Sequence, residues 1–464
     1  MNNKEQIFLR SALTLEGAVM SSANVMPWFW SRQDAHRFRL EKIPFSELSK
    51  WGFDADTGNL CHESGRFFSI EGIRVKTNWG SVPEWDQPII NQPEIGFLGF
   101  ITKKIDGVLH FLVQAKMEPG NINMIQLAPT LQATRSNFTR VHQGKSPPYL
   151  EYFIDRSNSK VLFDSLQSEQ GARFLRKRNR NIIIEVEHDI PVYEDYCWMT
   201  LGQVLQTMRH DNIVNMDART VISCISYGGS DGIQVTQGGL GASLLRSLDP
   251  LNRSEYSNEA IISWFTEQKF KYDLGIERIP LRIVHGWERT DMCVRHESGK
   301  FFSVIACAVE ADNREVSSWT QPLVKAHQQG LIAFVAKEFK GILHFLVQAK
   351  VEPGNFDVAE MAPTVQCLTG SYEEAAPEDR PPFIDYVLNA KLEQVCFDTL
   401  QSEEGGRFYR EENRNLFILA GEDFPEEVPE NYIWMTAAQL KEFIKYNNFV
   451  NVQARCLLSS LSFI

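Results

Sequence analysis

The feature of this chain that most constrains its fold is an internal repeat. The octapeptide LHFLVQAK begins at Leu109 and again at Leu343, and each copy is followed after one residue by EPGN. An ungapped register places His62 on His296 and continues, past a two-residue insertion, into the C-terminal part of both copies. A unit of about 200 residues is the size of an ordinary domain. The sequence therefore predicts two related domains in tandem.

The predicted domains span 20–225 and 255–464, and the stretch 226–254 joins them. This stretch is rich in glycine and serine, which is typical of an interdomain linker. It contains neither GxxxxGK[ST] nor a GxGxxG placed between a strand and a helix. We therefore interpret it as a linker rather than as a phosphate-binding loop.

The composition is that of a globular protein large enough for two cores, with 43% hydrophobic and 23% charged residues among 464. The formal net charge of −12 argues against non-specific nucleic-acid binding, which requires a basic surface. It does not exclude a small nucleotide bound by a local cluster of donors.

The eight cysteines form no CxxC pair, and Cys61, Cys197 and Cys307 have no cysteine at the matching position of the other copy. A disulfide framework or a zinc site would have been duplicated with the domain. The N-terminal segment lacks the features of a signal peptide, and no apolar run is long enough to span a membrane. We expect a cytoplasmic protein with no membrane association.

The predicted secondary structure is mixed. Strands are expected at 97–101, 108–117 and 160–163, with Asp106-Gly107 as the hairpin turn between the first two. The basic segment 168–178 is predicted to be helical, and Thr200 is predicted to cap a helix that runs through Met208. Since strands outweigh helices and hairpins dominate, we expect an α+β fold with an antiparallel or mixed sheet in each domain.

The strand 108–117 has two different faces. Its odd positions from 111 to 117 are apolar, whereas the even positions carry polar side chains apart from Leu112. The apolar side is predicted to face a core, and the other side is either solvated or lines a site. The second copy retains all of these polar residues, which favours a site: His110, Gln114, Lys116 and Glu118 match His344, Gln348, Lys350 and Glu352.

These strings resemble the NDP-hexose 2,3-dehydratases of deoxysugar biosynthesis. The resemblance rests on the duplication and on four blocks: LVQAKxEPGN, APTLQATRSN (128–137), SEQGARF (168–174) and NRN (179–181). It implies two fused domains of Nudix-like fold, a homodimer, and a sugar-nucleotide pocket in each repeat, one of them catalytic. The implied substrate is a nucleotide-linked 4-keto-6-deoxyhexose such as dTDP-4-keto-6-deoxyglucose, and no metal or other cofactor is required. A downstream 3-ketoreductase is expected to take the unstable product.

That substrate defines the chemistry that the pocket must supply. A ketone at C4 acidifies the hydrogen on C3, and the resulting enolate can expel the C2 hydroxyl. The enzyme then needs a base near C3, a donor for the C4 oxygen and an acid for the departing hydroxide. We predict Glu118, Lys116 and His62 as the catalytic residues, with their individual roles open; a simple salt bridge and a structural histidine are the alternatives.

Differences between the copies favour the first as the catalytic one. It has Thr134-Arg135-Ser136-Asn137 where the second has Leu368-Thr369-Gly370-Ser371, and Arg176-Lys177-Arg178 where the second has Arg410-Glu411-Glu412. Arginine forks and hydroxyl donors suit a diphosphate, although such a basic run can also be a solvated face. The predicted substrate-binding residues are Gln114, Asn121, Gln132, Thr134, Arg135, Ser136, Asn137, Tyr149, Tyr152, Arg173, Lys177 and Arg180. The predicted second-pocket equivalents of the catalytic and substrate-binding residues are Gln348, Lys350, Glu352, Arg407 and Arg414.

Two other classes of function remain open. A Nudix-like nucleotide-sugar hydrolase would need an acidic metal-binding helix with the pattern REUxEExGU, which the chain lacks. A non-catalytic protein that binds nucleotide sugars in duplicated pockets would show binding without turnover. The sequence identifies neither the base of the nucleotide nor the final deoxysugar.

Overall fold

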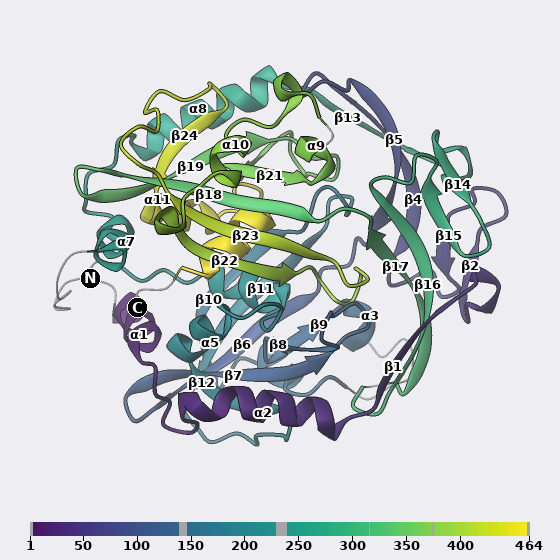
Figure 1. Cartoon of the computed structure of the whole chain (residues 1–464). Coiled ribbons are helices and arrows are strands. Elements are labelled where there is room, and N and C mark those ends of the chain that lie inside the picture. Colours follow the sequence, from purple (N-terminus) through teal and green to yellow (C-terminus); the bar gives the residue numbers. More distant parts are fainter. Residues whose placement is uncertain (1–2, 139–145, 229–238, 315, 374, 462–464) are drawn as a thin grey trace.

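Each repeat contains one large sheet and contributes strands to both small sheets (Figure 1). The computed structural model describes residues 3–138, 146–228, 239–314, 316–373 and 375–461. The first large sheet has the order β10-β11-β6-β7-β12, with β8 paired to β7 and β9 to β6. Its strands are β6 (Phe97–Ile105), β7 (Val108–Met117), β8 (Ile125–Ala128), β9 (Leu131–Ala133), β10 (Ser159–Ser168), β11 (Arg178–Val186) and β12 (Tyr196–Thr200). Only the β11–β6 pair is parallel, so the expected mixed sheet and α+β class are confirmed.

The second large sheet repeats this arrangement. Its order is β20-β19-β18-β23-β22, with β21 paired to β18 and β24 to β19. The strands are β18 (Gly330–Phe339), β19 (Ile342–Lys350), β20 (Glu360–Ala362), β21 (Val365–Leu368), β22 (Val395–Ser402), β23 (Glu412–Leu419) and β24 (Tyr432–Thr436). The α-helices are α1 (Asn3–Leu13), α2 (Ser22–Ala35), α3 (Arg135–Phe138), α4 (Leu150–Ile154), α5 (Leu201–Thr207), α6 (Met216–Ser223), α7 (Leu240–Leu248), α8 (Asn258–Lys271), α9 (Gly370–Glu373), α10 (Ile384–Leu388), α11 (Ala437–Ile444) and α12 (Val452–Ser459).

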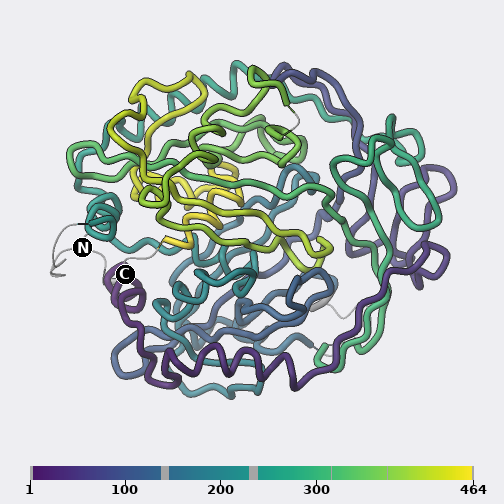
Figure 2. Tube along the Cα trace, viewed as in Figure 1, coloured from purple at the N-terminus to yellow at the C-terminus, as the bar shows by residue number. Residues whose placement is uncertain are grey.

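The two small sheets exchange a strand between the repeats. One combines β2 (Trp51–Phe53), β3 (Leu60–His62), β4 (Ser69–Thr77) and β5 (Glu84–Asn91) of the first repeat with β13 (Leu274–Ile279) of the second. The other combines β14 (Trp287–Arg289), β15 (Cys293–His296), β16 (Phe302–Ala311) and β17 (Ser318–Ala326) with β1 (Phe38–Ile43) of the first. Both crossing strands pair antiparallel, β1 with β16 and β13 with β4. The repeats are therefore interlocked, and Figure 2 shows the chain passing back and forth between them.

The EPGN loops also cross between the repeats. The Gly120 amide donates to the Gly405 carbonyl at 2.7 Å, and the Arg410 amide donates to the Gly120 carbonyl at 2.8 Å. The matching pair Gly354–Gly171 has the same 2.7 Å bond. A Cβ at Gly120 would overlap the carbonyl oxygen of Phe408, so only glycine fits this contact. The backbone of each EPGN loop is thus hydrogen-bonded to a turn of the other repeat.

The predicted helix at 168–178 is wrong. Strand β10 ends at Ser168 and β11 begins at Arg178, and the loop 169–177 between them contains a turn at 171–173. The backbone groups of this turn bond to the EPGN loop of the other repeat, and Arg176 adopts a positive φ of 47°. Composition indicated a helix, but a contact distant in sequence determines the local structure.

Other local predictions are confirmed. Asp106 and Gly107 form the β6–β7 turn with φ of 51° and 77°, as a type I′ turn requires. Thr200 caps α5 in a capping box with Gln203, and Met208 is its C-cap. The odd residues of β7 lie in the main core, while Leu112 on the opposite face packs in a second cluster with Tyr149 and Trp198.

The predicted linker 226–254 contains a helix. Helix α7 packs on β19, just as α1 packs on β7. The equivalence extends to side chains, since Ser11 and Ser247 donate to the Leu109 and Leu343 carbonyls respectively. No helix in the described ranges is long and apolar enough to cross a membrane.

Buried polar contacts between the repeats give a pH-dependent stability. Ser168 Oγ donates to the Glu360 carboxylate at 2.9 Å, and burial raises the pKa of Glu360 to about 7. As the pH rises, Glu360 loses its proton in the unfolded chain before it does so in the folded protein. Its contribution to the free energy of unfolding is therefore present at low pH and is lost as the pH rises through the folded-state pKa. The matching residue of the first repeat is Gln126, whose amide donates to Ser402 Oγ at 2.6 Å.

Glu360→Gln is therefore expected to stabilise the protein only at higher pH. The variant should unfold at the same urea concentration as the wild type at about pH 4, below the unfolded pKa, and gain up to about 3 kcal/mol at about pH 8. Urea titrations at both pH values measure this difference. A gain of equal size at both would show that Glu360 is ionised throughout, contrary to its burial.

Candidate active site

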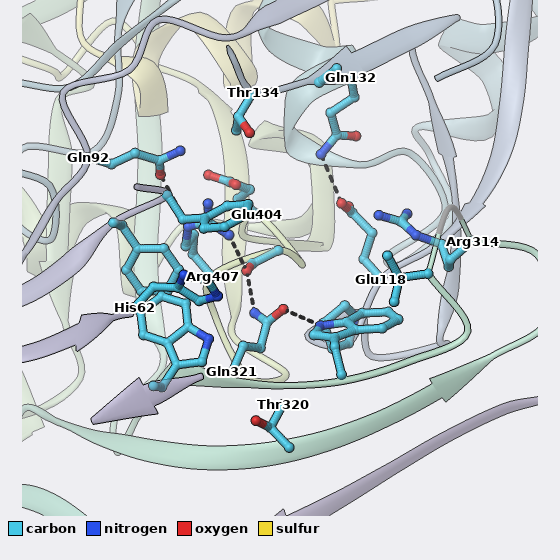
Figure 3. Close-up of a pocket in the computed structure, with 18 of the residues that line it drawn as sticks. His62, Gln92, Glu118, Gln132, Thr134, Arg314, Thr320, Gln321, Glu404 and Arg407 are labelled. Atoms are coloured by element: carbon cyan, nitrogen blue, oxygen red, sulfur yellow. Dashed lines mark hydrogen bonds between the residues drawn. The ribbon is translucent and has the colours of Figure 1, made fainter. Parts of the chain in front are cut away.

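A cavity of about 370 Å³ opens between the first large sheet and the small sheets (Figure 3). From the first repeat it is lined by Lys116, Glu118, Gln132, Thr134, Lys177 and Asp217, and from the second by Arg314, Trp319, Gln321, Glu404 and Arg407. A further group, here called the aromatic wall, consists of Trp51, His62, Phe67 and Phe68. The cavity therefore requires both repeats.

Glu118 is held by a chain of hydrogen bonds. Its Oε1 accepts from Gln132 Nε2 at 2.9 Å and lies 3.4 Å from the Lys116 ammonium. Asn215 orients Gln132 in turn, since its Nδ2 donates to Gln132 Oε1 at 3.1 Å. The buried Oε2 of Glu118 has no hydrogen-bond partner among the described residues. This oxygen is therefore placed to accept a proton from a ligand.

Two more carboxyls line the same cavity. Asp217 lies in the first turn of α6 with 3% of its surface exposed, and Glu404 comes from the turn of the second repeat that receives Gly120. Burial raises the pKa of Asp217 well above its usual value, and the negative charges of Glu404 and Glu169 raise it further. Burial also raises the pKa of Glu404. The cavity can therefore hold a neutral carboxylic acid near neutral pH.

Two cations stand beside these acids. Lys177 is buried and donates to Asn179 Oδ1 at 2.7 Å and to the Glu94 carbonyl; burial lowers its pKa, while the charge of Glu169 opposes the shift. Arg407 lies 4.2 Å from the centre of the Phe68 ring, and its Nε donates to Gln92 Oε1 at 3.1 Å (Figure 3). Since Lys177 also donates to the Arg178 carbonyl, its three N–H groups are engaged and it acts on a nearby diphosphate through its charge alone.

The aromatic wall is tightly packed. The Trp51 ring lies 5.2 Å from His62 and 4.7 Å from Phe68, and His62 lies 4.8 Å from Phe67. Across the cavity, Trp319 Nε1 donates to Gln321 Oε1 at 2.8 Å. Flat apolar faces of this kind can stack against a nucleobase.

The corresponding region of the second copy keeps the framework but not the acids. Gln366 Nε2 donates to Glu352 Oε1 at 2.9 Å, and Asn451 donates to Gln366 at 2.7 Å, which repeats the Asn215–Gln132–Glu118 chain. In the repeat register, however, Gln453 replaces Asp217 and Gln170 replaces Glu404. The Trp79 ring lies 5.1 Å from the Lys350 ammonium, at the position that Asn313 occupies in the other copy.

Comparison with known proteins agrees with this arrangement. The sequence profile described as NDP-hexose 2,3-dehydratase matches residues 22–225 and again 258–461. The chain belongs to the NDP-hexose 2,3-dehydratase family. It is 48% identical over 463 residues to a protein of Saccharopolyspora spinosa named dTDP-4-dehydro-6-deoxy-alpha-D-glucopyranose 2,3-dehydratase, covering 99% of this chain and 95% of that protein. The resemblance predicted from the sequence is thereby confirmed.

Two further relatives carry the same name. The protein of Streptomyces violaceoruber is 46% identical over 95% of this chain and 97% of its own length. That of Amycolatopsis orientalis is 43% identical over 97% of this chain and 92% of its own. The similarity to this family therefore extends over nearly the full length of all three.

Several predicted site residues of this family member meet in the cavity, namely Lys116, Glu118, His62, Gln132, Thr134 and Lys177. Thr134 Oγ1 is buried and without a hydrogen-bond partner in the described part of the chain, so it is available to a ligand. The His62 ring is fixed by Ser64 Oγ at 2.7 Å, and His296 makes the same bond to Ser298. Because both copies share this turn, it is part of the local fold.

Other predicted residues do not line this cavity. Tyr149 donates to the Pro191 carbonyl at 2.8 Å within an aromatic cluster, and Tyr152 packs on that cluster. Asn121 lies buried in the EPGN loop and donates to the Lys116 carbonyl at 3.5 Å. Gln114 lies in β7, opposite Tyr196 of β12.

The predicted diphosphate-binding stretch is likewise divided. Ser136 donates to the Glu94 carboxylate, Arg135 is exposed, and the Asn137 side chain lies outside the described residues. Arg180 pairs with Asp164, with Nε and Oδ1 2.6 Å apart. Its counterpart Arg414 pairs with Asp398 at 2.9 Å in the same way. Both pairs lie on the exposed side of their strands.

The exchange between the repeats reverses the predicted positions of two arginines. Arg173, expected in the first pocket, lies 4.3 Å from the Phe302 ring and acts electrostatically on Glu352. Its counterpart Arg407, expected in the second pocket, lines the cavity with Glu118. The other second-copy residue, Gln348, donates to the Pro363 carbonyl at 2.8 Å.

Sequence reasoning missed Asp217, Glu404, Arg314 and Trp319. A signal for the first two was present, because MDAR faces VQAR and SEQG faces SEEG when the copies are compared. In each pair a carboxylic acid faces an amide; the first pair also differs in Met against Val, and the second is otherwise identical. No comparable sequence signal identifies Arg314, whose counterpart is Gly80.

Proposed function

We propose that this chain removes the C2 hydroxyl of dTDP-4-keto-6-deoxyglucose in the cavity between its repeats. The observation that carries the proposal is the buried Glu118 carboxylate, with one oxygen held by Gln132 and Lys116 and the other without a partner among the described residues. The printed names of the three relatives support the choice of sugar nucleotide.

Glu118 and Lys116 divide the first step between them. The Glu118 carboxylate takes the C3 proton, and the electron pair of the C–H bond forms an enolate with the C4 carbonyl. The Lys116 ammonium donates to the developing oxyanion, which is the usual means of stabilising such charge in a site with little water. Expulsion of the C2 hydroxyl gives an enol that tautomerises to the 3-ketone. The product is a 3,4-diketo-2,6-dideoxyhexose.

The rest of the cavity suits a nucleoside diphosphate. Lys177, Arg314 and Arg407 are cations in its lining, and Thr134 offers an unused hydroxyl among the described residues. We place the diphosphate against these groups and the thymine on the aromatic wall, which includes His62. The sugar then extends toward Glu118 and Asp217.

Trp51→Ala should therefore weaken binding of the nucleotide more than it slows the chemistry. Removing one stacking face costs about 1–3 kcal/mol, so KM should rise roughly 5- to 100-fold while kcat stays within about threefold. Steady-state kinetics measure both. Trp287→Ala is the matched control, because Trp287 packs on His296 and Phe302 in the other small sheet. An equal rise in KM for both variants would argue against the placement of the base.

Three further assignments belong to the same proposal. Each large sheet with its helices is a Nudix-like core, which the mixed sheet order supports, and the protein works as a homodimer. A 3-ketoreductase consumes the reactive diketone.

Hydrolysis of the diphosphate is disfavoured, since the segment 168–178 is a basic turn without the acidic helix that such hydrolases use. Binding without turnover is the other alternative.

The decisive experiment incubates the purified protein with dTDP-4-keto-6-deoxyglucose and a coupled reductase, without added metal or nicotinamide for the dehydratase itself. Mass spectrometry should show a sugar that has lost one water and then gained two hydrogens. Magnesium-dependent release of thymidine monophosphate would instead indicate a hydrolase. An unchanged sugar nucleotide that nevertheless binds to the folded protein would indicate a binding protein.

A further inference from the structure

The dehydration needs an acid for the departing hydroxide, and Asp217 is placed to supply it. Its side chain is buried, lies in the cavity lining and interacts electrostatically with Glu118 and Lys116. Asn215 links Asp217 to the hydrogen-bond chain of Glu118. Its Nδ2 donates to Gln132, which holds Glu118. Its Oδ1 accepts from the Ala218 amide at 2.8 Å and so caps α6, the helix that carries Asp217. The start of α6 is thus fixed relative to the base.

The second repeat indicates that this acid is not needed for folding. Helix α12 has the same Asn cap, with Asn451 Oδ1 accepting from the Ala454 amide at 2.9 Å. Gln453 occupies the position of Asp217 there and is buried to the same 3% exposure. A neutral amide therefore fills an equivalent position in an equivalent helix. The carboxyl in the first repeat serves a purpose that packing does not require.

The surroundings of Asp217 raise its pKa. The charged groups that act on it are the carboxylates of Glu404 from the second repeat, Glu169 after β10 and Glu118 after β7, together with the cations Lys116 and Arg407. Burial is the largest cause of the shift, the three carboxylates add to it and the two cations oppose it, so the pKa of Asp217 is raised. A carboxylic acid kept neutral in this way can donate a proton at neutral pH. Glu404 is the first of these charges and is itself replaced by Gln170 in the other copy.

We propose that Asp217 is the general acid that protonates the departing C2 hydroxyl, with Glu404 as the positioning residue that acts through it. The assignment rests on the proposed dehydration. When the enolate collapses, the C4 carbonyl re-forms, a C2–C3 double bond forms and the C2–O bond breaks. The oxygen leaves with that electron pair, takes the Asp217 proton and departs as water. Glu118 has gained one proton and Asp217 has lost one, so a transfer through solvent restores both.

Hydrogen exchange separates the two steps. In heavy water, Asp217→Asn should still exchange the C3 hydrogen of dTDP-4-keto-6-deoxyglucose at a rate within about threefold of the wild type, because Glu118 and Lys116 are intact. Water loss should fall roughly 10²- to 10⁴-fold, as is typical when a general acid is removed. Asp217→Glu should recover part of the activity. Gln453→Asn, the matching change in α12, should leave both rates near the wild-type values.

Each outcome has one meaning. Water loss within tenfold of wild type in Asp217→Asn would overturn the proposal, and so would equal loss of exchange and elimination in a folded variant that still binds dTDP. If Asp217→Asn does not fold, Asp217→Gln, which copies the second repeat, is measured instead. Glu404→Gln should shift the alkaline limb of the kcat profile to lower pH, since it removes a negative charge that raises the pKa of Asp217; an unmoved limb would contradict its role. Failure of the wild type to show either exchange or water loss would instead refute the dehydration itself.

Discussion

Glu118→Gln is expected to lower kcat for water loss by about 10²- to 10⁴-fold while leaving dTDP binding within about threefold. Glutamine keeps the volume of the side chain and can accept the bond from Gln132, but it cannot take the C3 proton. Exchange of the C3 hydrogen in heavy water should disappear together with water loss. This distinguishes Glu118 from an acid that acts only on the leaving group.

Glu352→Gln is the matched control for this prediction. Glu352 is the retained counterpart of Glu118, and it accepts from Gln366 as Glu118 accepts from Gln132, so both changes disturb similar contacts. Burial raises the pKa of Glu352. The control should retain kcat within about threefold of wild type, because the second copy lacks the acids corresponding to Asp217 and Glu404. Equal losses in the two variants would mean that both regions catalyse or that both changes act through folding.

The second large effect is expected for Gly120→Ala, which adds a single methyl group to the EPGN loop. In Gly120→Ala the added carbon meets the Phe408 carbonyl, so the EPGN loop must move away from the turn that carries Glu404 and Arg407. Displacement of packed backbone should destabilise the protein by about 3 kcal/mol or more. Because Glu118 precedes this glycine in the loop, kcat/KM should fall about 100-fold, as expected when catalytic groups shift by about 1 Å.

Gly354→Ala separates these two consequences. The added carbon meets the Phe174 carbonyl in the corresponding contact of the other repeat, so the loss of stability should be similar. The cavity with Glu118 should keep most of its activity at temperatures where the variant is folded. Urea denaturation and initial rates measure both variants. A matching loss of activity in Gly354→Ala would imply that the two loop contacts form one cooperative unit.

The sequence was most informative where short-range interactions control the structure. The β6–β7 hairpin depends on Asp106-Gly107, and α5 depends on the Thr200 cap, so both could be recognised from a few neighbouring residues. The alternation in β7 identified its core face. The membership of the family was also predictable, because it rests on strings that remain nearly unchanged in both copies.

Predictions failed where a residue's partners come from the other repeat. The segment 168–178 is a turn because Gly354 binds to it, and no local pattern reports that contact. Arg173 and Arg407 were assigned to their own repeats, although the crossing loops place each near the glutamate of the other. Asp217 belongs to no retained pattern, because its counterpart in the second copy is Gln453 and the carboxyl is present in only one copy.

One comparison tests directly whether the working site is shared between the repeats. Arg407→Lys and Arg173→Lys make the same change at equivalent positions, and both keep the charge while losing the planar fork. If the cavity beside Glu118 is catalytic, kcat/KM for water loss from dTDP-4-keto-6-deoxyglucose should fall at least about tenfold in Arg407→Lys and stay within about threefold in Arg173→Lys. The reverse result, a large loss only in Arg173→Lys, would contradict a catalytic site in which the second repeat completes the first.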